Sequence, residues 1–326
     1  MRAGWCILLI LLPFVTGLVC LGIGRIYIPV YDIFAAFFGG TVSNMTRMTI
    51  WNLRLPRLLL AALAGAGLSC AGCAFQSLFA NPLATPDTLG VASGASFGAA
   101  LGLLLGLPLL GVQAAALIFG CLAVGLTWLA GSGKGKGLST IVLAGIMMGS
   151  MFNALVSLVK FMADEESQLP AITYWLMGGL NNAAFETLAL GAPPILAGIL
   201  ILYLLRWRMN LLPLNDDEAK ASGVNISVLR AITVLCATMI TASCVSMCGQ
   251  VGWVGLLVPH MCRMKFGSNH LSLLPASISF GAAFMIIVDT VARSASAQEI
   301  PISILTAIIG APFFIILMRR SGGWSL

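Results

Sequence analysis

The chain alternates between long apolar runs and short polar or charged segments. Stretches without Asp, Glu, Lys or Arg cover residues 3–24, 58–86, 88–133, 137–159, 167–185, 187–205, 231–262, 266–288 and 300–318. One helical crossing of a membrane takes about 20 mostly apolar residues. The runs are continuously apolar rather than alternating, which argues against a β-barrel. The pattern therefore predicts an all-α, polytopic membrane protein.

Three of the runs need interpretation before the crossings can be counted. The run 88–133 is long enough for two crossings, with a turn at Gly106-Leu107-Pro108. The run 231–262 is broken at Gly249-Gln250-Val251-Gly252, which predicts one full and one shorter helix. The run 167–185 is rich in Gly, Pro and Asn and is interpreted as an interfacial or broken segment. We therefore expect about ten transmembrane helices.

The first apolar run could be a signal peptide or a transmembrane helix. Residues 3–23 are long for a signal-peptide core and no clear cleavage site follows, which favours an uncleaved first helix. We expect residues 1–326 to form a single transmembrane domain.

Composition and charge agree with this class of protein. Hydrophobic residues make up 59% of the chain and charged residues 9%, where a soluble domain has about a quarter charged. Ten crossings place both termini on the same side of the membrane. If that side is the cytoplasm, the inner loops carry 11 basic residues: Arg2, Lys134, Lys136, Arg206, Arg208, Lys220, Arg230, Arg263, Lys265, Arg319 and Arg320. The outer loops carry 6: Arg25, Arg47, Arg54, Arg57, Lys160 and Arg293.

The positive-inside rule favours this orientation over its inverse. The net charge of +6 then reflects membrane topology, and we expect no nucleic-acid partner.

Two features could indicate metal or nucleotide chemistry. All nine cysteines fall inside or at the ends of apolar runs, and we interpret them as packing residues, so no metal site is expected. The segment Gly131–Gly137 resembles a phosphate-binding loop but has no Ser or Thr after either Gly-Lys, and we interpret it as a basic turn. The chain carries no catalytic motif, so we expect it not to be an enzyme and to bind no cofactor itself.

Asp289 and Arg293 are charged residues that border an apolar run. Their i,i+4 spacing predicts an ion pair on one helix face. An acid in a membrane is a candidate proton relay. Because the run ends at residue 288, we favour a structural pair at the outer interface over that alternative.

The most polar inner segment is residues 214–224. Asn215 can cap a helix, acidic residues fill the first turn and Gly223 can end it. The segment predicts a helix of about two turns outside the lipid, of a kind suited to a groove in a partner protein. A surface helix with no partner is the alternative.

Motifs spread over most of the chain resemble those of the FecCD-like permeases, the membrane subunits of type II ABC importers for iron–siderophore complexes, haem and vitamin B12. The first matching segment is Leu53-Arg54-Leu55-Pro56-Arg57, which is expected to open the second helix. The others are Asn81-Pro82-Leu83-Ala84-Thr85-Pro86-Asp87-Thr88-Leu89-Gly90, Tyr174–Gly179, residues 214–224, Gly252-Trp253-Val254-Gly255-Leu256-Leu257-Val258-Pro259-His260, Glu299-Ile300-Pro301 and Gly310–Phe314. The chain departs from the family at Asn269-His270-Leu271, at Pro301-Ile302-Ser303 and at Ala221-Ser222-Gly223.

The resemblance implies an assembly around this chain. It implies a fold like that of the vitamin B12 importer permease, a second copy of the chain, two cytoplasmic ATPase subunits that bind ATP and Mg, and a periplasmic or lipid-anchored substrate-binding protein. The expected location is the bacterial cytoplasmic (inner) membrane, with both termini in the cytoplasm.

The resemblance also assigns roles to residues. It implies ATPase coupling through Leu214, Asp216, Asp217, Glu218, Ala219, Ala221, Gly223 and Val224, and binding-protein docking through Arg54, Arg57 and Arg293. It places Asn81, Leu83, Ser139 and Thr140 at an inner gate, and Met147, Met148, Met151 and Asn153 along the pathway. Helix-end snorkelling of the arginines and ordinary capping or packing of the others are the alternatives.

The function expected from these observations is the permease of an ATP-driven importer. The expected cargo is an iron–siderophore or similar metal chelate, with haem, cobalamin or molybdate and tungstate as alternatives. An ion-coupled secondary transporter is the competing class, followed by an intramembrane enzyme or a structural subunit.

Overall fold

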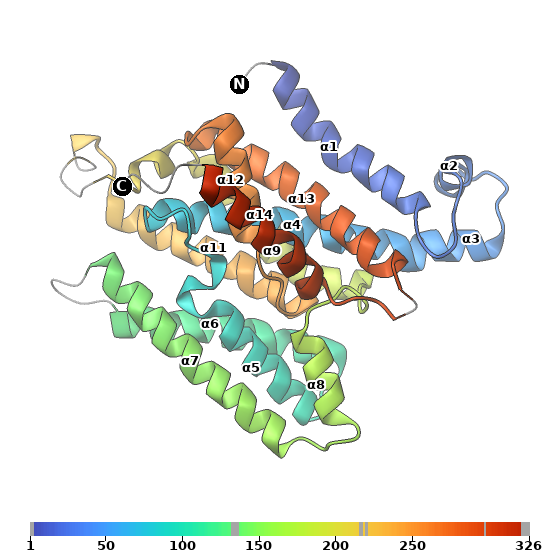
Figure 1. Ribbon diagram of the computed structural model, residues 1–326, viewed down its shortest axis with the longest axis horizontal. Helices are drawn as coiled ribbons and strands as arrows, with labels where there is room; N and C mark the ends of the chain where they lie inside the picture. Colours follow the sequence, from blue (N-terminus) through green and yellow to red (C-terminus); the bar gives the residue numbers. More distant parts are fainter. Residues whose placement is uncertain (1–2, 132–136, 215–217, 219–220, 297, 321–326) are drawn as a thin grey trace.

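The computed structural model describes residues 3–131, 137–214, 218, 221–296 and 298–320, and this part of the chain is helical without strands (Figure 1). Its elements are α1 (Ala3–Gly22), α2 (Val30–Phe38), α3 (Asn44–Met48), η1 (Thr49–Arg54), α4 (Leu55–Leu78), η2 (Pro86–Leu89), α5 (Val91–Leu104), α6 (Leu109–Gly131), α7 (Leu138–Met162), α8 (Gln168–Leu176), α9 (Phe185–Leu205), η3 (Arg208–Leu211), α11 (Ile226–Cys248), α12 (Val254–Phe266), α13 (His270–Ser294) and α14 (Ile302–Arg320).

The predicted helical crossings are present. Among the described residues, seven helices are long and apolar enough to cross a membrane, and α5 and the first part of α14 are shorter apolar helices. The 13-residue α12 lies between α11 and α13 and is the shorter of the two helices predicted for the run 231–262. The predicted turn at residues 106–108 separates α5 from α6, and the predicted broken segment contains the nine-residue α8.

The second crossing begins earlier than the sequence indicated. The helical run starts at Asn44, where the Ser43 side chain accepts a hydrogen bond from the Thr46 N–H, and continues to Leu78. It passes through the π-helical turn η1, in which the Leu55 N–H donates to the Ile50 carbonyl. The expectation that the helix opens at Leu53–Arg57 was wrong, because these arginines find partners inside the protein and need not mark a helix end.

Glycine contacts hold α4 in the centre of the bundle. About 78% of the α4 span is buried, compared with 33% for α7. A Cβ atom on Gly72 would lie 1.8 Å from the Gly255 carbonyl oxygen of α12, and one on Gly65 would lie 2.1 Å from the Gly281 carbonyl oxygen of α13. Helices that pack in lipid approach closely where small residues allow their backbones to touch.

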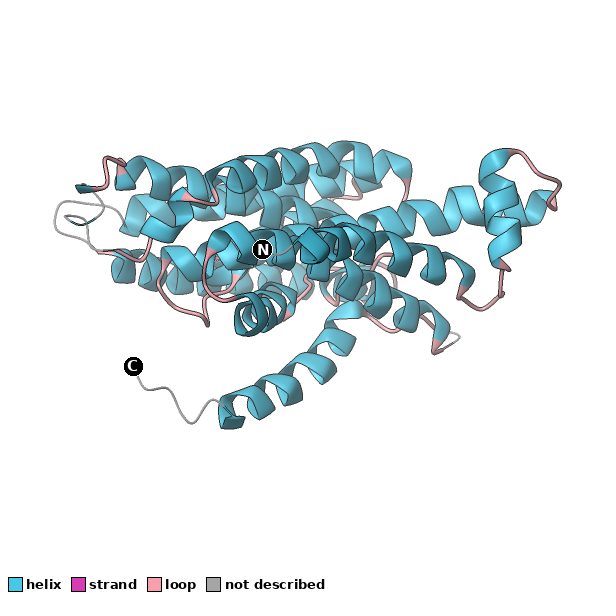
Figure 2. Cartoon of the chain, turned by 90° about the horizontal axis from the view of Figure 1, so that it is seen from above, coloured by secondary structure: helices cyan, strands magenta, loops and turns pink. Residues whose placement is uncertain are grey.

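Two helices lie at the edge of the bundle. In Figure 2, α14 diverges from the other helices towards the C-terminus. Its apolar residues Ile304, Ile308 and Ile309 are exposed. α7 also presents exposed Leu143, Ile146 and other apolar side chains.

The bundle has two functionally distinct ends, which α4 connects. The arginine end contains Arg54, Arg57 and Arg293, and the loop end contains residues 206–214, 221–225 and 263–270. The 24 residues of α4 span about 36 Å between them. α1 runs towards the arginine end and α14 runs away from it, so the start of α1 and the end of α14 lie towards the loop end (Figure 1).

Candidate functional site

Arginines and carboxylates form a buried ion-pair network at the arginine end. Arg57 on α4 donates from Nε to Asp289 Oδ1 on α13 at 2.8 Å, and from Nη1 to Glu299 Oε2 at 2.8 Å. The Arg57 and Asp289 side chains are only 13% and 5% exposed. Because Glu299 lies just before α14, the network joins α4, α13 and the segment that leads into α14.

Arg54 and Arg293 bind the C-terminal end of α1. Arg54 donates to the main-chain oxygens of Leu21 and Ile26, and Arg293 donates to that of Cys20. The last carbonyls of a helix carry partial negative charge and favour cations. A Cβ atom on Gly24 would lie 2.9 Å from Arg54 Nη2 and 3.2 Å from Arg293 Nη1, so the glycine makes room for both guanidinium groups.

The predicted roles of these residues can now be compared with their contacts. Asp289 and Arg293 do lie within ion-pair distance, at 3.8 Å, but Arg57 is the nearer partner of Asp289. Both side chains are largely buried between helices, and the position of the pair at the outer membrane interface stays a prediction. The docking role of Arg54, Arg57 and Arg293 stays a prediction, and a docking protein would have to compete with their partners in this chain.

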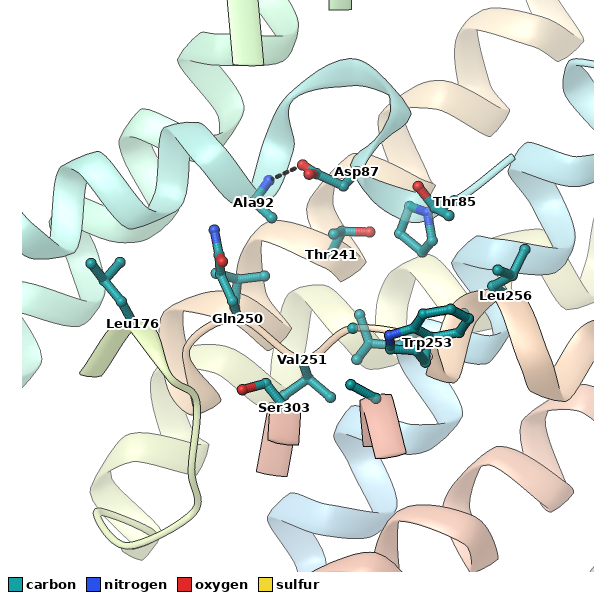
Figure 3. Close-up of a pocket in the computed structure, with 16 residues that line it drawn as sticks. Thr85, Asp87, Ala92, Leu176, Thr241, Gln250, Val251, Trp253, Leu256 and Ser303 are labelled. Atoms are coloured by element: carbon teal, nitrogen blue, oxygen red, sulfur yellow. Dashed lines mark hydrogen bonds between the residues drawn. The ribbon is translucent and has the colours of Figure 1, made fainter. Parts of the chain in front are cut away.

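A central cavity of about 390 Å³ lies between η2, the turn that follows α11, and α14 (Figure 3). Its polar lining comes from Thr85, Asp87, Thr241, Gln250 and Ser303. These side chains come from four separate parts of the chain and face a common space. The cavity therefore offers hydrogen-bonding groups inside an otherwise apolar bundle.

Asp87 is the acidic residue of this lining. Its Oδ1 accepts a hydrogen bond from the Ala92 N–H at 2.8 Å, which caps the start of α5. The side chain also borders the open space of the cavity. Asp87 was not predicted as a site residue, although it is the single charged residue between Arg57 and Lys134 in the sequence and could have been identified on that ground.

The turn between α11 and α12 shapes one wall of the cavity. Gly249 has a φ of 66° and Trp253 has a φ of 67°, a left-handed conformation that is unusual for tryptophan. The Trp253 indole lies against Gly310 of α14, where a Cβ atom would be 2.9 Å from the ring. Gln250 Nε2 donates to Ser96 Oγ at 2.9 Å. These contacts fix the turn in place before any ligand binds.

The predicted pathway residues lie on α7. Met147 and Met151 are 62% and 42% exposed, Asn153 is also exposed, and Met148 is half-buried. The opposite face of α7 packs on η2, where a Cβ atom on Gly145 would lie 2.2 Å from the Thr88 carbonyl oxygen. This contact places the buried face of α7 beside the loop that lines the central cavity, and the exposed face with Met147 and Met151 points away from that loop.

The predicted gate residues lie in two segments. The Asn81 Oδ1 accepts a hydrogen bond from the Leu83 N–H at 2.9 Å, so this pair forms a tight turn after α4. Leu83 is 43% exposed. Ser139 and Thr140 occupy the first turn of α7, where the Thr140 N–H donates to the Gly137 carbonyl. Both segments are solvent-accessible, and the gate role stays a prediction.

The predicted coupling segment lies at the loop end. Leu214, Glu218, Ala221 and Gly223 are exposed and Val224 is half-buried. Glu218 and Ala221 are helical, and the left-handed Gly223, with a φ of 72°, ends the helix as predicted. Asp216, Asp217 and Ala219 lie outside the described residues.

This architecture is that of a polytopic membrane protein: among the described residues, seven helices long and apolar enough to cross a membrane pack with shorter helices around a central cavity that has a few polar lining groups. The sequence profile of the FecCD transport family matches residues 9–320. The chain belongs to this family and is a permease subunit of an ABC importer.

Two named relatives match this chain over most of their length. The chain is 40% identical over 317 residues to the molybdate import system permease protein MolB of Haemophilus influenzae, covering 96% of this chain and 94% of the relative. It is 34% identical over 288 residues to the hemin transport system permease protein HmuU of Yersinia pestis, covering 86% of each.

A solved structure shares the fold. It is described as an inward-facing conformation of a metal-chelate type ABC transporter, is 40% identical, and superposes with a TM-score of 0.88 over 96% of this chain and 97% of the other. Similarity over nearly the full length of both chains confirms the predicted fold class.

Proposed function

We propose that two copies of this chain form the translocation pathway of an ATP-driven importer in the bacterial cytoplasmic membrane. The observation that carries the proposal is the exposed face of α7. Ser150, Asn153 and Ser157 interrupt its apolar residues and are exposed in the isolated chain. Polar side chains in a membrane helix face protein or water rather than lipid, which suits a face that meets a second copy around a pathway.

The loop end is the proposed cytoplasmic end. This orientation assigns 11 of the 17 basic residues in the sequence to the cytoplasmic side and 6 to the outer side, as the positive-inside rule favours. Residues 214–224 are the proposed contact with the ATPase subunits, which would hydrolyse ATP and move the segment as they close. The arginine end then faces outward, where a substrate-binding protein would deliver cargo and compete for the contacts of Arg54, Arg57 and Arg293.

The proposed cargo is a metal chelate of the iron–siderophore type. A molybdate-type oxyanion is the second candidate, because the chain is 40% identical to a relative named for molybdate import and 34% identical to one named for hemin transport. Uptake of labelled iron chelates and labelled molybdate into the same proteoliposomes separates the two candidates.

The mechanism can be tested by reconstituting the chain with its ATPase and binding protein. Uptake should require ATP and should stop with an ATPase variant that binds but does not hydrolyse it. A proton gradient imposed without ATP should drive no uptake. Gradient-driven uptake by the chain alone would contradict the proposal and indicate an ion-coupled secondary transporter.

A further inference from the structure

A second cavity, of about 640 Å³, opens at the loop end between α4, η3 and the turn that joins α12 to α13. It is lined by Gln76, Ser77, Ala80, Asn81, Pro82, Asn210, Pro213, Arg263, Ser268, Asn269 and His270. This lining contains a guanidinium and an imidazole group, and no carboxylate is found among these residues. The cavity therefore has a positive potential and many hydrogen-bonding groups.

Arg263 supplies the positive charge of this loop-end cavity. It lies half-buried in the last turn of α12. None of the hydrogen bonds or ion pairs within the described residues involves its guanidinium group. Arg57 at the arginine end, by contrast, is paired with two carboxylates at 2.8 Å. A half-buried guanidinium without an anion is a strong site for one, because no contact among the described residues has to be displaced.

His270 supplies a buried nitrogen without a partner. The residue is 5% exposed, and its Nε2 has no hydrogen-bond partner among the residues that the structure describes. Its Nδ1 lies 3.0 Å from Asn210 Oδ1, while Asn210 Nδ2 donates to the Trp207 carbonyl oxygen at 3.1 Å. This network assigns the proton to Nδ1, so Nε2 is an acceptor that needs a donor.

The two groups together define the chemistry of a ligand. It must carry negative charge for Arg263 and must also carry a hydrogen that it can donate to His270 Nε2. Asn81 also lines the cavity and can add a donor through its Nδ2, because its Oδ1 accepts the hydrogen bond from the Leu83 N–H. The positive end of the α13 dipole, at His270, adds to the attraction.

We propose that Arg263 and His270 form a binding site for phosphate, either free or as a phosphate monoester. Phosphate keeps an acidic hydrogen at neutral pH, whereas sulfate and molybdate do not, so the acceptor on His270 selects phosphate among oxyanions of similar size. A metal cation would satisfy the histidine nitrogen but would be repelled by Arg263. The proposal concerns binding and does not depend on which cargo the permease carries.

Two substitutions test the site while preserving the local structure. Arg263→Gln removes the charge at nearly the same side-chain length. Asn269→Asp keeps the acceptor that caps the Leu271 N–H at 3.0 Å but adds a carboxylate to the cavity lining. Lys265→Gln is the matched control, because Lys265 lies outside the cavity lining and packs over the Trp5 ring at 4.7 Å.

The measurement is calorimetric titration of the purified full-length chain with inorganic phosphate and with sulfate, at constant ionic strength balanced by chloride. We expect saturable phosphate binding that weakens at least tenfold in Arg263→Gln and Asn269→Asp and is unchanged in Lys265→Gln. Sulfate should bind at least tenfold more weakly than phosphate.

Nanodiscs with and without phosphatidic acid identify the source of the phosphate group. If phosphatidic acid weakens the binding of inorganic phosphate, the site takes a lipid monoester, and if it does not, the site takes free phosphate. No phosphate binding in the wild type, equal binding in the variants, or sulfate binding as tight as that of phosphate would overturn the proposal. The proposal would also be overturned if the wild type did not bind phosphate and Arg263→Gln lost its association with the ATPase. That result would indicate that Arg263 binds an acidic side chain of the ATPase.

Discussion

The arginine end and the loop end use charge in opposite ways. At the arginine end, Arg57 is buried and bonded to Asp289 and Glu299, while Arg54 and Arg293 bind the end of α1. At the loop end, Glu218 is exposed and Arg263 has no partner among the described residues. Charges at the first end hold helices together, and charges at the second end are available to other molecules. The comparison predicts that substitutions at the first end cost stability and that those at the second end cost function.

The largest effect on stability is expected at Arg57. Arg57→Met leaves Asp289, which is 3% exposed, without its nearest cation, and should lower the free energy of unfolding by about 3–5 kcal/mol. Arg47→Met is the control, because Arg47 is exposed and donates only to the Gly40 carbonyl among its described contacts. Chemical unfolding in mild detergent measures both. Equal losses would show that the network does not stabilise the arginine end.

A smaller loss of stability is expected at Gly24. In Gly24→Ala the new methyl group would displace the guanidinium groups of Arg54 and Arg293 from the end of α1, at a cost of about 1–3 kcal/mol. Gly4→Ala lies on the same stretch of chain with nothing within 4 Å of the new atom, and should be neutral. Thermal unfolding of the two variants side by side gives the comparison. A neutral Gly24→Ala would mean that the two arginines are not held at this position.

A functional loss without a loss of stability is expected at Glu218. Glu218→Lys should change the unfolding free energy by no more than about 0.5 kcal/mol, because the side chain is exposed. It should lower ATP-driven uptake at least tenfold, a change of about 1.4 kcal/mol. Glu186→Lys, exposed at the start of α9 at the opposite end, should leave uptake within twofold of wild type. Similar uptake in both variants would remove the functional distinction between the ends.

The smallest effect is expected at Asp87, in the cavity between the two ends. Asp87→Asn keeps an acceptor for the Ala92 N–H and removes the negative charge. If molybdate crosses the central cavity, its uptake should rise about two- to fivefold, since a like charge about 4 Å away costs roughly 1 kcal/mol in water. Uptake of labelled molybdate measures the effect. A fall in uptake would show that the carboxylate assists the anion.

Much of the fold could be predicted from the sequence because membrane helices leave a strong pattern. The apolar runs, the turn at residues 106–108 and the break at residues 249–252 were all interpreted correctly, since each follows from hydrophobicity or from glycine and proline. The start of the second helix was placed too late. Arg54 and Arg57 were interpreted as marking the start of the helix. They lie inside it because Arg54 binds the end of α1 and Arg57 binds Asp289, which is 232 residues away in the sequence.

The site was less predictable because its contacts join distant segments. Hydrophobicity does not show that Arg57 pairs with Glu299 or that the Trp253 ring lies on Gly310. The resemblance to the family included the segments that carry these four residues, but it did not predict either contact. Asp87 could have been identified from the sequence, because it is an isolated charged residue in a long apolar region. The structure places it in the lining of the central cavity.

Site-specific photo-crosslinking tests the central claim most directly. A photoreactive residue is placed at position 218 in one variant and at position 186 in another, and each is expressed with the ATPase and the binding protein. The account predicts crosslinks to the ATPase from position 218 and none from position 186. Crosslinks to the ATPase from position 186, or to the binding protein from position 218, would contradict it.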